Sequence, residues 1–106
     1  DVLGSRGLGD VYKRQDKDAL IFSNVKSNYV ILNEKKAGKH IRFTFGDSPF
    51  LAIWAKPAAP FVCIEPWYGV NDSYEKATDF SKKRGIQKLS SCEKFEFSWS
   101  AEFKED

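Results

Sequence analysis

The sequence lacks methionine, has only two cysteines and one histidine among its 106 residues, and contains no long apolar run. Because an intact reading frame normally begins with methionine, its absence predicts a processed chain or a fragment. Without a run of about 18 apolar residues, the sequence predicts no membrane-spanning helix and no membrane partner. Cys63 and Cys92 form no CxxC pair, and His40 supplies no second set of ligands, so no metal site is predicted.

The charge is also close to balanced, at +2 from 17 basic and 15 acidic residues of interspersed sign. A nucleic-acid partner is not predicted, because such proteins concentrate basic residues on one surface. The densest basic run, Lys82-Lys83-Arg84, is short and is interpreted as a solvated loop. Nine Phe, four Tyr and three Trp exclude a disordered chain, so the sequence predicts one small domain or part of a larger one.

The first fifteen residues have a different character from the rest. They carry three glycines and scattered charges with no period, which predicts no strand. Residues 10–15 read DVYKRQ, which is the translation of GATGTGTATAAGAGACAG, the transposon end used in sequencing libraries. We therefore expect residues 1–15 to be a non-native leader and residues 16–106 to be the domain. A natural flexible leader is the alternative.

Residues 16–106 show the alternation of half-buried β-strands. The clearest example is residues 95–103, where Phe, Trp and Ala alternate with Glu and Ser to give one apolar and one polar face. Residues 40–45 alternate in the same way. Residues 29–32 predict a shorter strand, and the polar, glycine-containing residues 33–39 predict a hairpin loop between the two.

Two further runs, residues 50–55 and 61–64, are apolar on both faces, which predicts central strands covered on both sides. Residues 66–85 predict a long loop, with a weakly signalled helical turn at 74–77, and residues 86–89 a short strand. The result is an all-β antiparallel meander of six or seven strands. Since no helix is predicted to cover its central strands, we expect a missing second sheet, and hence the C-terminal part of a larger β-sandwich.

The segment from Trp54 to Gly69 is the most informative for function. Glu65 ends an apolar strand and is followed at once by Pro66, Trp67 and Tyr68. Carboxylates are rarely buried without a partner, and burial of a carboxyl group suits it to proton transfer. Aromatic rings beside a carboxylate also suit a sugar, whose C–H faces stack while its hydroxyls hydrogen-bond. The alternative is a solvent-facing glutamate beside ordinary core aromatics.

The string Trp54-Ala55-Lys56-Pro57, continued by residues 59–69, resembles the C-terminal signature of the aldose 1-epimerase (galactose mutarotase) family. The nearest resemblance is to its bacterial branch of LacX-like proteins. Weaker matching stretches are residues 18–22, 47–50 and 83–86, so the resemblance covers essentially residues 18–103.

The resemblance implies a large antiparallel β-sandwich, or supersandwich, that binds a free hexose in a cleft on one sheet. Such enzymes interconvert the α and β anomers, acting in the cytoplasm and without a cofactor. A glutamate near the C-terminus is the general base on the anomeric hydroxyl, and a histidine is the general acid on the ring oxygen. Glu65 stands at the position of that base.

The family's acid histidine and sugar-clamping residues lie upstream of the matching region. His40 does not match them and shares the polar face of its strand, so it is interpreted as a surface residue, and we expect the chain by itself to be inactive. Candidates for sugar contact are Trp54, Lys56, Trp67 and Tyr68, each with an alternative role in the core, at a strand end or in loop packing. A non-catalytic sugar-binding or sugar-sensing protein on the same fold, and a purely structural β-domain, are the competing hypotheses. The sequence leaves the sugar and the oligomeric state open.

Overall fold

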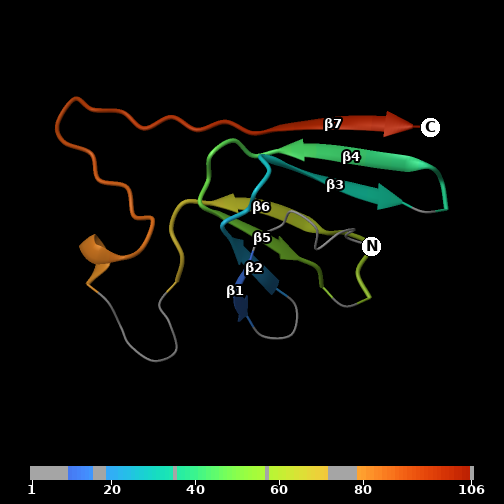
Figure 1. Ribbon diagram of the computed structural model, residues 1–106, viewed down its shortest axis with the longest axis horizontal. Helices are drawn as coiled ribbons and strands as arrows, with labels where there is room; N and C mark the ends of the chain where they lie inside the picture. Colours follow the sequence, from blue (N-terminus) through green and yellow to red (C-terminus); the bar gives the residue numbers. More distant parts are fainter. Residues whose placement is uncertain (1–9, 16–18, 35, 57, 72–78, 106) are drawn as a thin grey trace.

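The computed structural model describes residues 10–15, 19–34, 36–56, 58–71 and 79–105, and it confirms an all-β fold with antiparallel strands. The described residues form seven strands and one 3-10 turn (Figure 1): β1 Asp10–Gln15, β2 Ala19–Ser23, β3 Tyr29–Glu34, β4 Lys39–Thr44, β5 Phe50–Trp54, β6 Cys63–Trp67, η1 Phe80–Lys82 and β7 Ser100–Glu105. No helix in this part of the chain has the length and apolar character needed to cross a bilayer.

The strands belong to two sheets, one of four strands in the order β1-β2-β5-β6 and one of three in the order β3-β4-β7. The expected meander is wrong, because β2 pairs with β5 and β4 pairs with β7 across long stretches of sequence. Figure 1 shows β7 beside β4 at the edge of the smaller sheet, after a long segment that extends to one end of the molecule.

The two sheets pack through a shared apolar core. Phe43 of β4 and Phe45 just after it meet Phe22, Leu51 and Ile53 of the four-stranded sheet. The alternation of residues 40–45 therefore has the predicted consequence, since its apolar members face the second sheet and Arg42 stacks over the Tyr29 ring on the opposite face.

Strand β5 is buried on both faces, as its uninterrupted apolar sequence predicts. Leu51 and Ile53 face the three-stranded sheet, whereas Phe50 and Ala52 belong to a second cluster with Ile21, Val70 and Trp67. The expectation that the chain lacks a second sheet is wrong for the first of these faces, because β3, β4 and β7 of the same chain cover it.

Strand β6 does not have the predicted character. It begins at Cys63 rather than Phe61, is half-buried throughout and, among the described strands, is the last of its sheet rather than a central one. Ile64 packs against the inter-sheet core on one face of the sheet, and Trp67 packs against the second cluster on the other face. A two-sided apolar run therefore does not distinguish an edge strand from a central one.

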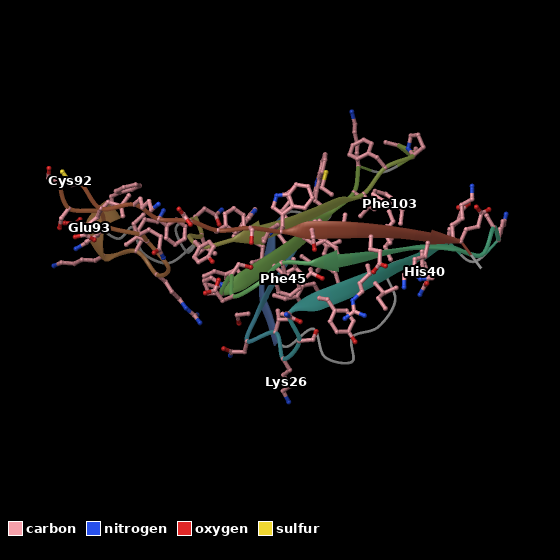
Figure 2. All side chains as sticks on the ribbon, turned by 90° about the horizontal axis from the view of Figure 1, so that it is seen from above. Lys26, His40, Phe45, Cys92, Glu93 and Phe103 are labelled. Atoms are coloured by element: carbon pink, nitrogen blue, oxygen red, sulfur yellow. The ribbon has the colours of Figure 1, made fainter. Side chains whose placement is uncertain are left out.

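The strand predicted over residues 95–103 is present only from Ser100 onward. Its partner β4 ends at Thr44, opposite Ser100, and the chain then turns at Gly46 with a φ of +63°. Residues 95–99 consequently pair with no described strand. Their aromatic side chains stay exposed, although Phe95 and Phe97 contact the Tyr68 ring and Trp99 stacks on Phe43. Figure 2 shows Cys92 and Glu93, which precede this stretch, at the end of the molecule opposite His40.

Three other predictions concern short segments, and each has a different outcome in the structure. Residues 86–89 form no strand. The helical turn expected at 74–77 falls outside the described residues, and the structure instead has η1 just beyond it. Residues 10–15, in which no strand was expected, pair with β2 as β1, with a shift in register between Val11 and Lys13.

Candidate functional site

Three of the five predicted site residues lie on one face of the four-stranded sheet. In the β5–β6 pair, Trp54 is opposite Cys63, Ala52 is opposite Glu65 and Phe50 is opposite Trp67. Directly opposed residues of antiparallel strands project to the same side of a sheet, and so do residues two apart on one strand. Trp54, Glu65 and Trp67 therefore share a face, which is the face directed away from the three-stranded sheet.

The Glu65 carboxylate is held by its neighbour on the same strand. The indole Nε1–H of Trp67 donates a hydrogen bond of 3.1 Å to Glu65 Oε2. The glutamate is half-buried, and its cross-strand partner is the small Ala52. A carboxylate has about four lone-pair positions, so one indole donor fixes its orientation and leaves capacity for hydroxyl groups.

The floor beneath this carboxylate is apolar and fully buried. Phe50 and Ala52 on β5 and Ile21 on β2 are at most 1% exposed, and Trp67 packs against the cluster that they form with Val70. Side chains in such clusters are close-packed and lie in rotamer minima, so Glu65 stands on a well-packed surface.

Trp54 and Lys56 mark the far end of the face. The half-buried Trp54 ring lies 5.6 Å from the ring of Phe61, at 53° between planes, so the two aromatics close this end of the β5–β6 hairpin. Lys56 lies beyond the last residue of β5 and is exposed. The structure thus brings Trp54 to the Glu65 face but places Lys56 in the connecting loop.

Tyr68 is engaged by a different set of residues. Its hydroxyl donates a hydrogen bond of 2.5 Å to Asp47 Oδ1. Its ring is met edge-on by Phe95 at 4.8 Å and by Phe97 at 5.5 Å. Sequence reasoning missed the role of Asp47, because a pairing over 21 residues leaves no local pattern. The loop-packing alternative considered for Tyr68 describes these contacts.

The hydrogen bond to Asp47 raises the pKa of Tyr68 above its ordinary value, and desolvation and the negative charge of Asp47 act in the same direction. We expect Asp47→Ala to return the pKa of Tyr68 toward 10.0, which an ultraviolet titration of tyrosinate would show. Because the folded-state pKa is the higher one, the stabilisation from this contact is complete below pH 10.0 and is lost as the pH rises through the raised value.

The control for this titration is Tyr68→Phe, which should remove the component with the raised pKa from the wild-type curve. An unchanged titration of Asp47→Ala would contradict the assigned cause.

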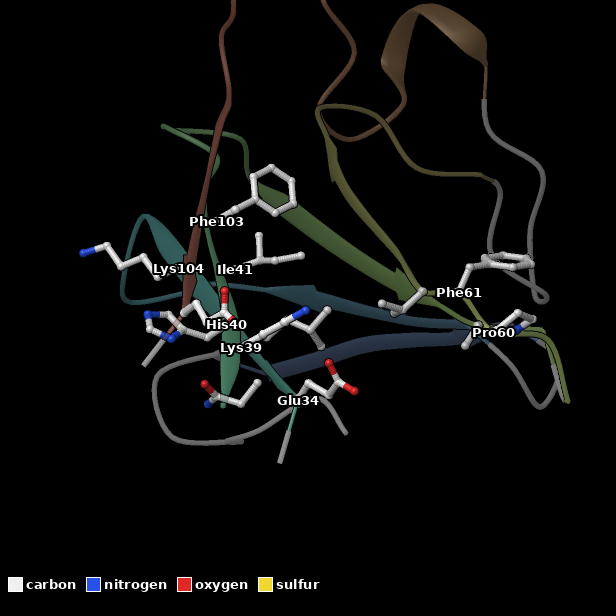
Figure 3. A pocket seen from close by; sticks show the side chains of 13 residues that line it. Glu34, Lys39, His40, Ile41, Pro60, Phe61, Phe103 and Lys104 are labelled. Carbon is white, nitrogen blue, oxygen red and sulfur yellow. The ribbon is translucent and has the colours of Figure 1, made fainter. Parts of the chain in front are cut away.

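Two hollows open on the described surface, and Glu65 lines neither of them. The smaller, of about 580 Å³, borders the site through Trp67 and Tyr68 and is also lined by Phe95 and Phe97. The larger, of about 960 Å³, lies between the end of the three-stranded sheet and the β5–β6 connection. Figure 3 shows Lys39, His40 and Lys104 on one side of it and Pro60 and Phe61 on the other.

His40 has the predicted position on its strand, on the face shared with Arg42. It is half-buried rather than fully exposed and lines the larger hollow. Since His40 is on β4 and Glu65 is on β6, the single histidine and the candidate base belong to different sheets. Across the residues that the structure describes, no three His, Cys, Asp or Glu side chains gather so that they could hold a metal ion.

Comparison with known proteins gives relatives but no family model. A scan of family models and a search of solved structures both find no match. Two curated proteins of Lactococcus lactis subsp. lactis, the plasmid and the chromosomal protein LacX, are each 33% identical to the chain over 79 residues. The aligned stretch covers 74% of this chain and 26% of each relative, so the chain spans about a quarter of their length. The chain is therefore similar to one segment of the LacX proteins.

Proposed function

We propose that this chain is a segment of an aldose 1-epimerase-like protein that interconverts the anomers of a free hexose in the cytoplasm. The observation that carries the proposal is the placement of Glu65 between Trp54 and Trp67 on one sheet face, with its carboxylate oriented by the Trp67 indole. The similarity to LacX proteins and the resemblance of residues 54–69 to the aldose 1-epimerase signature support it.

In the proposed reaction Glu65 takes the proton from the anomeric hydroxyl of the sugar. The electron pair left on that oxygen forms the carbonyl at C1 as the bond from C1 to the ring oxygen breaks, and an acid gives its proton to the ring oxygen. Rotation about the bond from C1 to C2 and reversal of the steps give the other anomer. No net proton or electron is consumed, so the residues need only hold, take and return protons.

The two tryptophans have a distinct part in this proposal. Trp54 and Trp67 flank the carboxylate and offer apolar ring faces to the C–H groups of the sugar, while Glu65 accepts hydrogen bonds from its hydroxyls. Tyr68 and Trp67 form the wall of the adjoining hollow of about 580 Å³, which has room for a hexose that extends beyond the base.

A second candidate, sugar binding without turnover, is favoured by the position of the histidine. His40 belongs to the other sheet, so the described residues place no imidazole beside Glu65. We therefore propose that the chain by itself holds only the base of the acid–base pair, and that turnover requires an acid from elsewhere in a longer protein.

Sugar binding by the chain is tested through the Trp67 indole. Adding hexose should shift the Nε1–H resonance of Trp67, because that proton bonds the carboxylate that receives the sugar. Trp67→Phe should weaken binding about fivefold or more, since it removes a hydrogen bond to a charged group and part of the stacking surface.

The matched control is Trp99→Phe, because Trp99 stacks at 5.3 Å on Phe43, which belongs to the other sheet. Equal affinity of the Trp67→Phe variant and the wild type would reject this face as the sugar site.

A further inference from the structure

Strand β7 leaves one of its edges unpaired by the described residues. All six residues, Ser100–Glu105, are in register with β4 on one side, and β7 is the last strand in the order β3-β4-β7. The strand contains no proline or glycine, and five of its six residues are exposed. An edge of this kind presents a row of backbone N–H and C=O groups that another strand can pair with.

The two faces of β7 differ in chemistry. Phe103 is opposite Ile41 and Ala101 is opposite Phe43, so these two side chains lie on the apolar face of the sheet. Ala101 packs against the inter-sheet core, but Phe103 is 75% exposed, the largest fraction among the exposed large hydrophobic residues described. Glu102 and Lys104 lie on the opposite face, where they form an exposed ion pair of 3.4 Å.

We propose that β7 pairs with β7 of a second copy of this chain, antiparallel and about a two-fold axis at Phe103. In this register Phe103 is opposite the partner's Phe103, and Glu102 is opposite the partner's Lys104. By symmetry Lys104 is opposite the partner's Glu102, so two ion pairs form across the axis. The two three-stranded sheets become one continuous six-stranded sheet, a size within the common range.

The charge pattern selects this register over its neighbours. If the joined sheet is to keep one continuous apolar face, directly opposed residues of the two strands must lie on the same face. The two-fold axis can therefore lie at one residue of β7 or at the next, but not between two residues. An axis at Glu102 places two glutamates opposite each other, and an axis at Lys104 places two lysines opposite each other. Like charges directly opposed destabilise strand pairing, whereas opposite charges favour it.

The exposed ring of Phe103 supplies the apolar part of the interface. Phe103 lines the hollow of about 960 Å³ between the sheets, where it is in the same row as Leu32 and Ile41 (Figure 3). The partner's Phe103 would cover this ring from the unpaired edge. Aromatic pairs directly opposed across antiparallel strands are among the favourable cross-strand pairs.

The first experiment measures the mass of the 106-residue chain by sedimentation equilibrium over a range of concentrations. We expect a dimer in equilibrium with monomer. Lys104→Glu should raise the dimer dissociation constant by about tenfold, because both ion pairs become pairs of glutamates. The double variant Glu102→Lys with Lys104→Glu should return the constant toward that of the wild type.

Mixing separates interchain from intrachain effects. Glu102→Lys places a lysine opposite Arg42 within one chain, and this cost is the same alone and in a mixture. A mixture of the Glu102→Lys and Lys104→Glu chains should form heterodimers in preference to either homodimer, as native mass spectrometry would show. A wild-type chain that stays monomeric, or a mixture with no preference for heterodimers, overturns the proposal.

The register is tested by cross-linking in a background with Cys63→Ser and Cys92→Ser. Opposed residues of antiparallel strands have Cα atoms about 4.5–5.5 Å apart, within the range of a disulfide. Phe103→Cys should therefore oxidise to a covalent dimer, whereas Ala101→Cys, which is opposite the partner's Glu105, should not. A dimer that cross-links through Cys at position 101 but not at position 103 overturns the proposed register.

Discussion

Glu65→Gln, introduced into a longer protein that carries this segment, is expected to lower the rate of anomer interconversion by roughly 10²–10⁴-fold. Glutamine keeps the shape of the side chain and an oxygen that accepts the hydrogen bond from the Trp67 indole. It cannot accept the proton of the anomeric hydroxyl. Affinity for the sugar should remain within a few-fold of the wild type, because the aromatic faces of Trp54 and Trp67 are unchanged.

Polarimetry of a freshly dissolved pure anomer measures this rate directly. Glu96→Gln is the matched control, since that glutamate is 75% exposed in an ion pair with Lys94 on the C-terminal segment and should leave the rate unchanged. Turnover that survives in Glu65→Gln would reject the general-base role. A parent protein that binds the sugar but never turns it over would instead favour the non-catalytic alternative.

The second large effect is expected at Gly85, whose replacement by alanine should lower the free energy of unfolding by about 2–4 kcal/mol. The backbone φ at Gly85 is +78°, a conformation that costs energy for any residue with a Cβ atom. An added Cβ would also collide with the carbonyl oxygen of Tyr68 and lie 3.3 Å from Cε2 of Phe50. Phe50 belongs to the packed floor of the site and Tyr68 to its rim, so neither residue has much room to move away from the added Cβ atom.

Gly69→Ala is the control for this substitution. A Cβ at Gly69 would meet no atom within 4 Å, so we expect stability equal to the wild type or slightly higher. Denaturant titration of the wild type and both variants provides the comparison. Equal unfolding midpoints for Gly85→Ala and Gly69→Ala would mean that residues 84–85 are not packed against Tyr68.

The fold was predictable where periodicity reports burial directly. The alternation at residues 40–45 and the uninterrupted apolar run of β5 correspond to one-sided and two-sided burial in the structure. The periodicity of a sequence does not say which strands are neighbours in a sheet, so the pairing of β2 with β5 and of β4 with β7 was not predictable from it. It also does not say where a partner strand ends, which is why residues 95–99 have the pattern of a strand without being one.

The candidate site shows the same division. Strand alternation is enough to place Glu65 and Trp67 on one face, and the β5–β6 register then adds Trp54. The contact between Tyr68 and Asp47 depends on the path of a connection with no regular structure. Such contacts leave no trace in local sequence, because nothing in a short window constrains which distant segment returns to the same place.

The two-sided burial of strand β5 constrains how the sequence of this protein can evolve. Leu51 and Ile53 fill the space between the sheets, and Ala52, between them on the backbone, lies directly beside Glu65. Under the role proposed for Glu65, selection for a well-filled core and selection for the position of the carboxylate therefore act on the same five residues. Neither can drift independently, and a lineage that repacks the core must also re-establish the geometry of the carboxylate on the other side of the strand.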